Sequence, residues 1–250
     1  MLYFNHMKKH LPSFVIVIIT CLVLIIVPAV IKYNHNRLNT LTQVDTDLHV
    51  KIHAIDEIGK EYNAHAEYPL LTDDENWNTE ISQFITTTIA DFKKEVHDNN
   101  ESRKATAGPN EKVTPVIGDM TIRFQVGQMN MTAVSVVLFV DYYAGGANGN
   151  STIKTFNYNP QTKTFLTLND IKGKLSLDDI ANNVREELKN RFPDENVASM
   201  IDEGTASKIA NFENLTFDAN TMTFYFEKYA VLPGVYGTQT VSIPRLLVQN

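Results

Sequence analysis

The sequence has a single cysteine, Cys21, which falls inside an uncharged apolar run, so the rest of the chain has no thiol and cannot form a disulfide. It also has no G-x-S-x-G nucleophile motif. The glycine-rich stretch GGANGN is not followed by the Lys-Ser/Thr pair or the apolar helix of a phosphate-binding loop. These absences exclude a cysteine nucleophile outside the apolar run, the common serine-hydrolase pattern and a P-loop.

The apolar run LPSFVIVIITCLVLIIVPAVI, residues 11–31, contains no charge. As a helix it is long enough to cross about 30 Å of hydrocarbon. We expect a single-pass signal-anchor: residues 1–10 form a short cytoplasmic N-terminus, residues 32–47 a polar stalk, and the C-terminal domain is extracellular at the cell membrane. A cleaved signal peptide is the alternative, although the run exceeds a typical signal-peptide core.

Charge narrows the partners of the predicted extracellular part. The chain carries 22 basic and 29 acidic residues, and the only charges before the apolar run are Lys8 and Lys9, which leaves a net charge of −9 beyond it. An acidic domain does not bind nucleic acid by bulk electrostatics, but it steers basic proteins toward itself.

Hydrophobic periodicity predicts amphipathic helices over 75–97 and 175–192 and a shorter helix within 193–212. Residues 98–115 are polar and aperiodic, which predicts a long surface loop. The fold class is therefore α+β, with two small units (48–143 and 144–250) whose antiparallel sheets are each covered by an amphipathic helix. The predicted strands lie within 50–71, 121–128, 132–143, 151–159, 163–168, 214–229 and 238–244.

Candidate catalytic and metal-binding residues are sparse. His49 and His53 have the spacing of a helical metal pair, but they lie in a strand-like segment that holds them about 13 Å apart. Asp141 and Glu227 are the best candidates for a pair of catalytic carboxylates, with a solvated strand face as the alternative. We expect no catalytic residue, no metal site and no cofactor.

Two stretches combine tyrosine with glycine, DYYAGGANGN at 141–150 and KYAVLPGVYG at 228–237. Tyrosine provides a rigid, amphipathic contact surface for protein and sugar recognition. Core tyrosines beside turns are the alternative, but two adjacent tyrosines in a strand point to opposite faces, so one of them faces away from the core. We expect the ligand to contact the loop 98–115 and seven further residues. These predicted ligand-binding residues are Tyr142, Tyr143, Gly145, Gly146, Asn148, Tyr229 and Tyr236.

The segments YYAGGANGNSTIKTFNYNPQTKTFLTLNDI and NFENLTFDANTMTFYFEKYAVLPGVYGTQTVSIPRL resemble signatures of an extracytoplasmic module. RsiV-type anti-sigma factors and PdaC-type peptidoglycan deacetylases share this module. YNAHAEYPLL and the following helix are similar to the module's smaller N-terminal domain. The resemblance covers about residues 48–248, and it labels the first unit PdaC-type and the second RsiV-type.

The resemblance implies an anchored binding or sensing module for a cell-envelope ligand, either a lysozyme-like basic protein or peptidoglycan. Asn148 stands where the family often has histidine. The few residues before the apolar run lead us to expect no sigma-factor binding, and we expect no deacetylase activity. The alternatives are a cell-wall-modifying hydrolase or deacetylase and a remnant of an RsiV-like anti-sigma factor.

Overall fold

We describe the protein from a computed structural model, in which residues 48–245 are placed. These described residues belong to one compact unit. The predicted cytoplasmic residues 1–10, membrane segment 11–31 and stalk 32–47 lie outside the described residues. Among residues 48–245, no helix combines the length and the apolar character needed to cross a bilayer.

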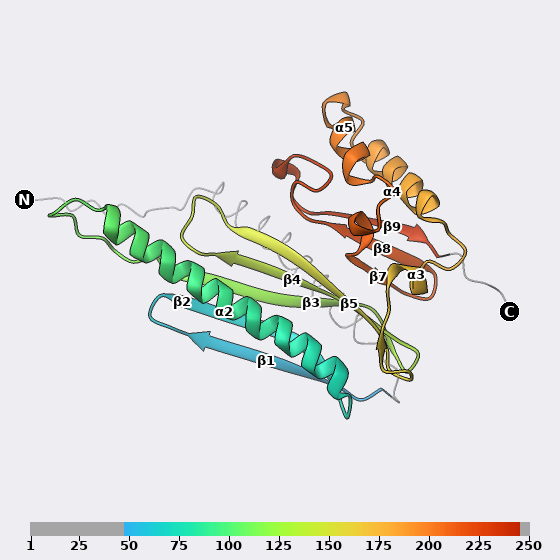
Figure 1. Ribbon diagram of the computed structural model, residues 1–250, viewed down its shortest axis with the longest axis horizontal. Helices are drawn as coiled ribbons and strands as arrows, with labels where there is room; N and C mark the ends of the chain where they lie inside the picture. The colour runs from blue at the N-terminus through green and yellow to red at the C-terminus, as the bar shows by residue number, and fades with distance from the viewer. Residues whose placement is uncertain (1–47, 246–250) are drawn as a thin grey trace, which may run out of the picture. The chain divides into compact units, whose positions relative to one another are not determined.

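The larger sheet has six strands, in an order that follows the chain (Figure 1). All neighbouring strands are antiparallel except β2 and β3, which run parallel because a long helix joins them. The predicted α+β class with antiparallel sheets is confirmed, with one parallel pair added. The strands are β1 (Val50–Ile58), β2 (Tyr62–Leu71), β3 (Gly118–Asn130), β4 (Ala133–Tyr143), β5 (Asn150–Asn159) and β6 (Thr164–Phe165).

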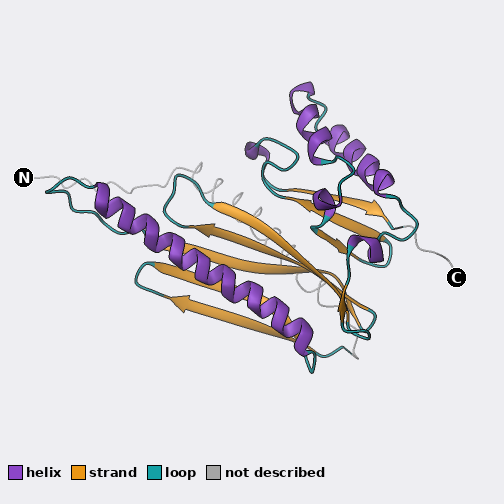
Figure 2. Ribbon diagram, in the orientation of Figure 1, coloured by secondary structure: helices purple, strands orange, loops and turns teal. Residues whose placement is uncertain are grey.

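Helix α2 (Glu75–Thr106) covers one face of this sheet (Figure 2). Its buried residues, from Trp77 to Val96, recur at helical spacing as the periodicity predicts. Asp74 is the N-cap, and its carboxylate accepts a hydrogen bond from the Trp77 N–H at 3.1 Å.

The helix continues beyond its predicted end, so the predicted surface loop 98–115 is wrong as far as Thr106. The reason is Asn100, which takes the next buried position of the stripe with 1% exposure. Its carboxamide donates to the Val116 carbonyl at 3.0 Å and accepts from the Val116 N–H at 2.8 Å. A polar residue at a core position hid the continuation of the pattern.

The second sheet is three-stranded, in the order β7-β8-β9, and packs with α4 and α5 around a second hydrophobic core. Ser176 caps α4: its hydroxyl accepts from the Asp179 N–H at 3.0 Å. The elements are α3 (Leu168–Ile171), α4 (Leu177–Arg191), α5 (Glu195–Gly204), β7 (Leu215–Phe217), β8 (Thr221–Phe226) and β9 (Gln239–Pro244), with short 3-10 helices at Ile209–Phe212 and Gly234–Tyr236.

A buried polar seam joins the two sheets. The Ser135 hydroxyl accepts from the Phe217 N–H at 2.8 Å and donates to the Asn157 side-chain oxygen at 2.6 Å. The Asn157 amide in turn donates to the Leu215 carbonyl at 2.9 Å. At the bulge in β3, a Cβ on Gly127 would lie 2.7 Å from the Phe217 carbonyl oxygen, so only glycine permits this close approach.

The sheets divide the chain after β6, whereas the predicted boundary between units lay at residues 143 and 144. The difference arises because β4 and β5 form one continuous hairpin. Its pairing runs from Tyr142 opposite Asn150 to Val134 opposite Tyr158. The loop 144–149 is therefore a turn within the larger sheet.

Candidate functional site

The predicted loop 144–149 lies at one end of the six-stranded sheet, which we call the distal end. Strand pairing brings together here Tyr62 with Gly118, Asp119 with Tyr143, and Tyr142 with Asn150. The opposite end, which we call the proximal end, holds Leu48, where the described chain begins. With about 3.3 Å per residue, the 11 residues of β4 separate the two ends by about 35 Å.

The tyrosine pair at the end of β4 is divided between the two faces of the sheet, as predicted. Tyr142 is half-buried under α2, with its ring in edge contact with Phe92 at 5.9 Å. Burial, with a smaller contribution from Glu95, raises the pKa of Tyr142. Tyr143 is 38% exposed and belongs to the surface. Tyr143 is therefore the member of the pair that is available to a ligand.

The glycine loop itself is short and tied down. Gly145 has φ +100°, a conformation that favours glycine, and a Cβ there would meet Val116 at 3.3 Å. The Asn99 amide of α2 donates to the Ala144 carbonyl at 2.8 Å. Gly146 and Asn148 are exposed at the tip. The loop thus holds a fixed bend with an accessible apex.

The second tyrosine-glycine stretch forms a compact loop between β8 and β9. Tyr229 is 65% exposed, and its ring lies over Gly234, where a Cβ would be 2.2 Å from the Tyr229 ring. Tyr236 is 43% exposed and in edge contact with Phe192, while Val235 between them is 89% exposed. Buried Val231 anchors the loop in the second core. The exposed aromatic groups are therefore displayed on a packed support.

The β8–β9 loop extends toward the distal end. β8 runs in the same direction as β4, because its partner β7 is fixed in the seam with Phe217 at Ser135 and Leu215 at Thr155. The Glu227 carboxylate, which begins the loop, accepts from the Ile153 N–H near the start of β5 at 2.8 Å. Figure 1 shows this loop and the β4–β5 loop projecting to the same side.

The two carboxylates considered for catalysis are held in local contacts. Asp141 accepts hydrogen bonds from Arg123 and Ser151, both at 2.5 Å. The Glu227 carboxylate accepts the hydrogen bond from the Ile153 N–H of β5 that is described above. These bonds give each carboxylate a structural use.

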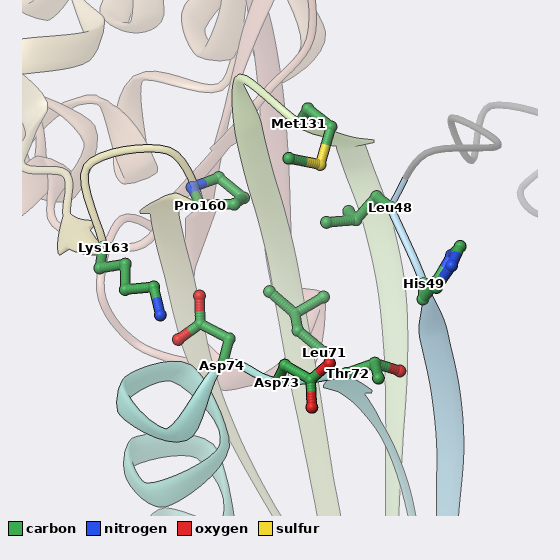
Figure 3. Close-up of a pocket in the computed structure, with 9 residues that line it drawn as sticks. All are labelled: Leu48, His49, Leu71, Thr72, Asp73, Asp74, Met131, Pro160 and Lys163. Carbon is green, nitrogen blue, oxygen red and sulfur yellow. The ribbon is translucent and has the colours of Figure 1, made fainter.

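The proximal end contains a shallow cavity of about 220 Å³ (Figure 3). Asp74 on its wall is buried and accepts the Tyr158 hydroxyl at 2.8 and 3.0 Å. None of the predicted contact residues lines this cavity. Its lining consists of Leu48, His49, Leu71, Thr72, Asp73, Asp74, Met131, Pro160 and Lys163.

The histidines of the described chain are not gathered into one site. His49 lines the proximal cavity, while the His53 ring lies edge-on to Tyr68 at 5.2 Å. His65 contacts Asp56 at 2.6 Å, and His97 lies 3.4 Å from Glu61. Within residues 48–245 no group of three or more histidine, cysteine or acidic side chains is arranged to hold a metal ion.

The second sheet and its helices match a known protein family. Residues 169–245 match the family model "Protein of unknown function (DUF3298)". The matched segment starts within α3 and includes α4, α5 and β7 to β9. The β8–β9 loop thus belongs to the DUF3298 segment, and the β4–β5 loop lies outside it.

A longer similarity extends over both sheets. The chain is 26% identical over 230 residues to peptidoglycan-N-acetylmuramic acid deacetylase PdaC of Bacillus subtilis (strain 168), a match covering 87% of this chain and 46% of that protein. The chain therefore spans about half the length of this curated relative. Together with the DUF3298 match, this similarity supports a PdaC-like, DUF3298-containing relationship.

Two solved structures share the fold, and at their low identities they show the fold alone. A DUF3298 family member from Bacteroides fragilis has a TM-score of 0.60 at 18% identity, covering 79% of this chain and 90% of that chain. A DUF3298 family protein from Pseudomonas aeruginosa PAO1 has a TM-score of 0.54 at 14% identity, with the same coverages.

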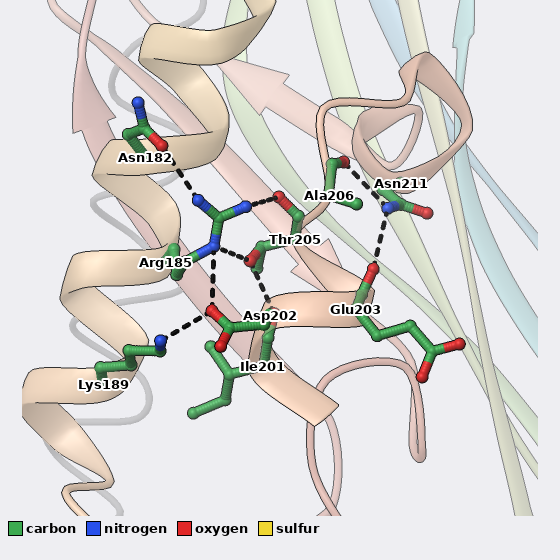
Figure 4. A network of polar contacts seen from close by, with 9 residues as sticks. All are labelled: Asn182, Arg185, Lys189, Ile201, Asp202, Glu203, Thr205, Ala206 and Asn211. Atoms are coloured by element: carbon green, nitrogen blue, oxygen red, sulfur yellow. Dashed lines mark hydrogen bonds and ion pairs between the residues drawn. The ribbon is translucent and has the colours of Figure 1, made fainter. Parts of the chain in front are cut away.

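Within the DUF3298 segment, an ion-pair network supports the β8–β9 loop (Figure 4). Arg185 of α4 donates to the Thr205 hydroxyl at 3.1 Å and carbonyl at 2.8 Å. Lys189 pairs with Asp202 of α5 at 2.7 Å. These contacts fix the end of α5, where Gly204 packs so closely that a Cβ would lie 2.0 Å from the Ala230 carbonyl oxygen of the loop.

Sequence reasoning missed three exposed apolar residues at or near these loops: Ile58, Ile117 and Val235. Val235 directly precedes Tyr236 in a stretch that was predicted to contact a ligand, so its exposure could have been inferred from that neighbour. Ile58 ends β1 and Ile117 precedes β3, both in apolar patterns typical of a core, and only the strand ends show that they reach the surface.

Proposed function

We propose that the protein is a single-pass membrane protein whose extracellular part binds a cell-envelope ligand without catalysis. The supporting observation is the position of its exposed apolar side chains. Eight large hydrophobic residues of the described chain are exposed, and six of them belong to the distal end or to the β8–β9 loop that extends toward it. These six are Ile58, Ile117, Tyr143, Tyr229, Val235 and Tyr236.

The gathering of these side chains supports recognition because scattered single apolar residues are normal on a surface, whereas a cluster is typical of an interaction site. Tyrosine in particular offers a large contact area with little loss of conformational freedom. The other two are Ile52, near the proximal end of β1, and Ile209, in the 3-10 helix Ile209–Phe212. A ligand in the cell envelope would therefore meet the end farthest from the predicted stalk.

Two ligand classes fit this surface, and the relatives favour the envelope for both. PdaC is named for its action on peptidoglycan, and tyrosine rings pack well against sugar rings. A lysozyme-like basic protein is the second class, because the sequence carries a net charge of −7. Peptidoglycan is the ligand that we test first.

The experiment incubates the soluble fragment 45–250 with purified peptidoglycan and measures both the bound protein and the released products. Binding without release of acetate or sugar fragments is the expected result. Release of either product would contradict the non-catalytic proposal and would favour the alternative, an envelope hydrolase or deacetylase that uses Asp141 or Glu227.

Calorimetry of the same fragment against lysozyme at two salt concentrations tests the second ligand class. Affinity that weakens with added salt supports steering by the acidic domain. Lack of binding removes the protein partner and leaves peptidoglycan.

An anti-sigma role is the remaining alternative, motivated by the RsiV-like signatures. A pull-down with residues 1–10 as bait tests it, and we expect no sigma factor to be retained.

A further inference from the structure

The first strand of the six-stranded sheet has an unpaired outer edge. β1 is the terminal strand of the sheet and pairs along its whole length with β2 on one side only. Figure 1 shows no other described element beyond it. A long, regular free edge is a template for pairing with another strand.

The other sheet margins in the described chain are shorter, and side chains contact two of them. At the opposite edge of the sheet, β6 has only two residues, and the Glu227 carboxylate accepts a hydrogen bond from the Ile153 N–H of β5. In the second sheet, the Arg191 guanidinium donates to the Thr240 carbonyl of β9 at 2.9 Å. Within residues 48–245, β1 is therefore the longest strand at a sheet margin.

The register with β2 determines which backbone groups of β1 point outward. The His49 backbone carbonyl accepts from the Thr72 N–H at 2.9 Å, and the Gly59 N–H donates to the Tyr62 carbonyl at 2.7 Å. The backbone groups of the odd-numbered residues therefore face β2. Backbone groups alternate along a strand, which turns those of the even-numbered residues to the free edge. These residues are Val50, Ile52, Ala54, Asp56 and Ile58.

We propose that the free edge of β1 pairs with β1 of a second copy of this chain, antiparallel and centred on Ala54. In this register the outward groups of Val50 meet those of Ile58 in the partner copy, those of Ile52 meet Asp56, and Ala54 meets itself on the twofold axis. All nine residues of β1 take part. A self-complementary patch of this kind is what a twofold dimer requires.

Side-chain charge selects this register over its neighbours. With Ala54 on the axis, Lys51 of each copy lies opposite Glu57 of the other, as a directly facing cross-strand pair. Shifting the centre by one or more residues in either direction removes both pairs. Glu57 contacts Lys93 of α2, so the Glu57 carboxylate lies on the sheet face that α2 covers. Lys51 lies on the same face, because side chains alternate along a strand.

Apolar exposure is consistent with the same pairing. Ile58 is 88% exposed at the end of β1, and Ile52 is also exposed. On the sheet face opposite α2, pairing sets Ile58 beside Val50 of the second copy. A second copy is therefore favoured over a foreign strand, because the same nine residues supply both the free groups and the complementary charges.

Disulfide trapping tests the register directly in the full chain, with Cys21→Ser as background. On the twofold axis, the two Cα atoms of position 54 are about 5.5 Å apart, within the range of a disulfide. Ala54→Cys is exposed in the monomer and leaves the β1–β2 bonds intact. We expect mild oxidation of membranes to convert this variant to a species of doubled mass on non-reducing gels.

Ile58→Cys is the matched control. Its side chain is more exposed, but in the proposed register the two copies of residue 58 lie about 26 Å apart, at about 3.3 Å per residue. Random collision therefore favours position 58, while the proposed pairing favours position 54. Equal or greater cross-linking at position 58 would overturn the proposal.

Two further variants keep the proposal testable without the new thiol. Ala54→Pro removes an outward N–H that β2 does not use, so we expect an unchanged circular dichroism spectrum and a shift from dimer to monomer in light scattering of the detergent-solubilised chain. Lys51→Glu should reduce cross-linking of Ala54→Cys, because it sets like charges opposite each other in both cross-strand pairs. A wild-type chain that is monomeric at all concentrations tested contradicts the pairing.

Discussion

The Tyr158 hydroxyl and the Asp74 carboxylate form a buried polar pair that ties the larger sheet to the start of α2. Tyr158 lies in β5 and donates to both oxygens of Asp74, which also caps the helix. Removing the hydroxyl leaves a buried carboxylate short of a donor, an unfavourable state in a protein interior.

We therefore expect Tyr158→Phe to lower the free energy of unfolding by about 1–3 kcal/mol. Urea denaturation of fragment 45–250 measures the change. Tyr143→Phe removes an exposed hydroxyl and should shift the unfolding free energy by less than about 0.5 kcal/mol. Equal effects of the two substitutions would show that the Asp74 pair is not stabilising.

The same tyrosine predicts a dependence of stability on alkaline pH. Burial, followed by the hydrogen bond and charge of Asp74, raises the pKa of Tyr158 to about 12. The unfolded pKa is about 10, so the folded state keeps the proton longer, and its stability falls as pH rises from about 10 to about 12. Denaturation midpoints across this range should fall more steeply for the wild type than for Tyr158→Phe; parallel slopes would contradict the assignment.

Single residues also show what sequence reasoning reaches at this scale. Alternation in a strand was enough to predict that one of Tyr142 and Tyr143 faces outward. It did not indicate which one, because that depends on the side of the sheet that α2 covers. The bonds of Asp141 and Glu227 were not predictable either, since Arg123, Ser151 and Ile153 approach them through sheet pairing and the contact between sheets.

At the scale of elements, Asn100 joins the end of α2 to the segment that leads into β3. Asn100→Ala removes both bonds to the Val116 backbone, and we expect faster hydrogen exchange at Val116 and faster proteolysis within 107–115. Asp98→Ala, which removes an exposed pair with Lys94, is the matched control and should leave both rates unchanged. No difference between the variants would show that the segment is held by other contacts.

The seam between the sheets depends on Ser135 in a comparable way. Ser135→Ala deletes the acceptor for Phe217 and the donor to Asn157 inside the core, and we expect a loss of about 1–3 kcal/mol in the free energy of unfolding. Ser151→Ala, whose hydroxyl bonds Asp141 at an exposed site, should cost less. Chemical denaturation of fragment 45–250 compares the two, and a larger effect at Ser151 would contradict a structural seam.

Elements were predictable wherever a single periodicity dominates. The apolar stripes of α2 and α4 and the alternating strands were recognised in the sequence. The continuation of α2 was missed because Asn100 interrupts the stripe. The parallel pairing of β2 with β3 was missed because no local pattern shows that the strands before and after the helix are neighbours in one sheet. The assignment of β5 to the larger sheet likewise depends on pairing rather than composition.

At the scale of the whole molecule, we predict that the distal end binds the ligand. Its exposed apolar residues come from both sheets, so no single stretch of sequence contains the surface. The two tyrosine-glycine stretches were nevertheless visible in the sequence as uncharged loops. Ile58 and Ile117 join them only through the strand order.

The most direct test compares how fragment 45–250 and two variants bind purified peptidoglycan in a co-sedimentation titration. Tyr229→Ala combined with Val235→Ser changes the exposed loop, whereas Ile209→Ala removes another exposed apolar side chain elsewhere on the DUF3298 segment. We predict that the loop variant binds about tenfold or more weakly, as loss of a central aromatic contact typically costs, and that Ile209→Ala binds like the wild type. Equal binding by all three proteins would contradict the distal binding surface.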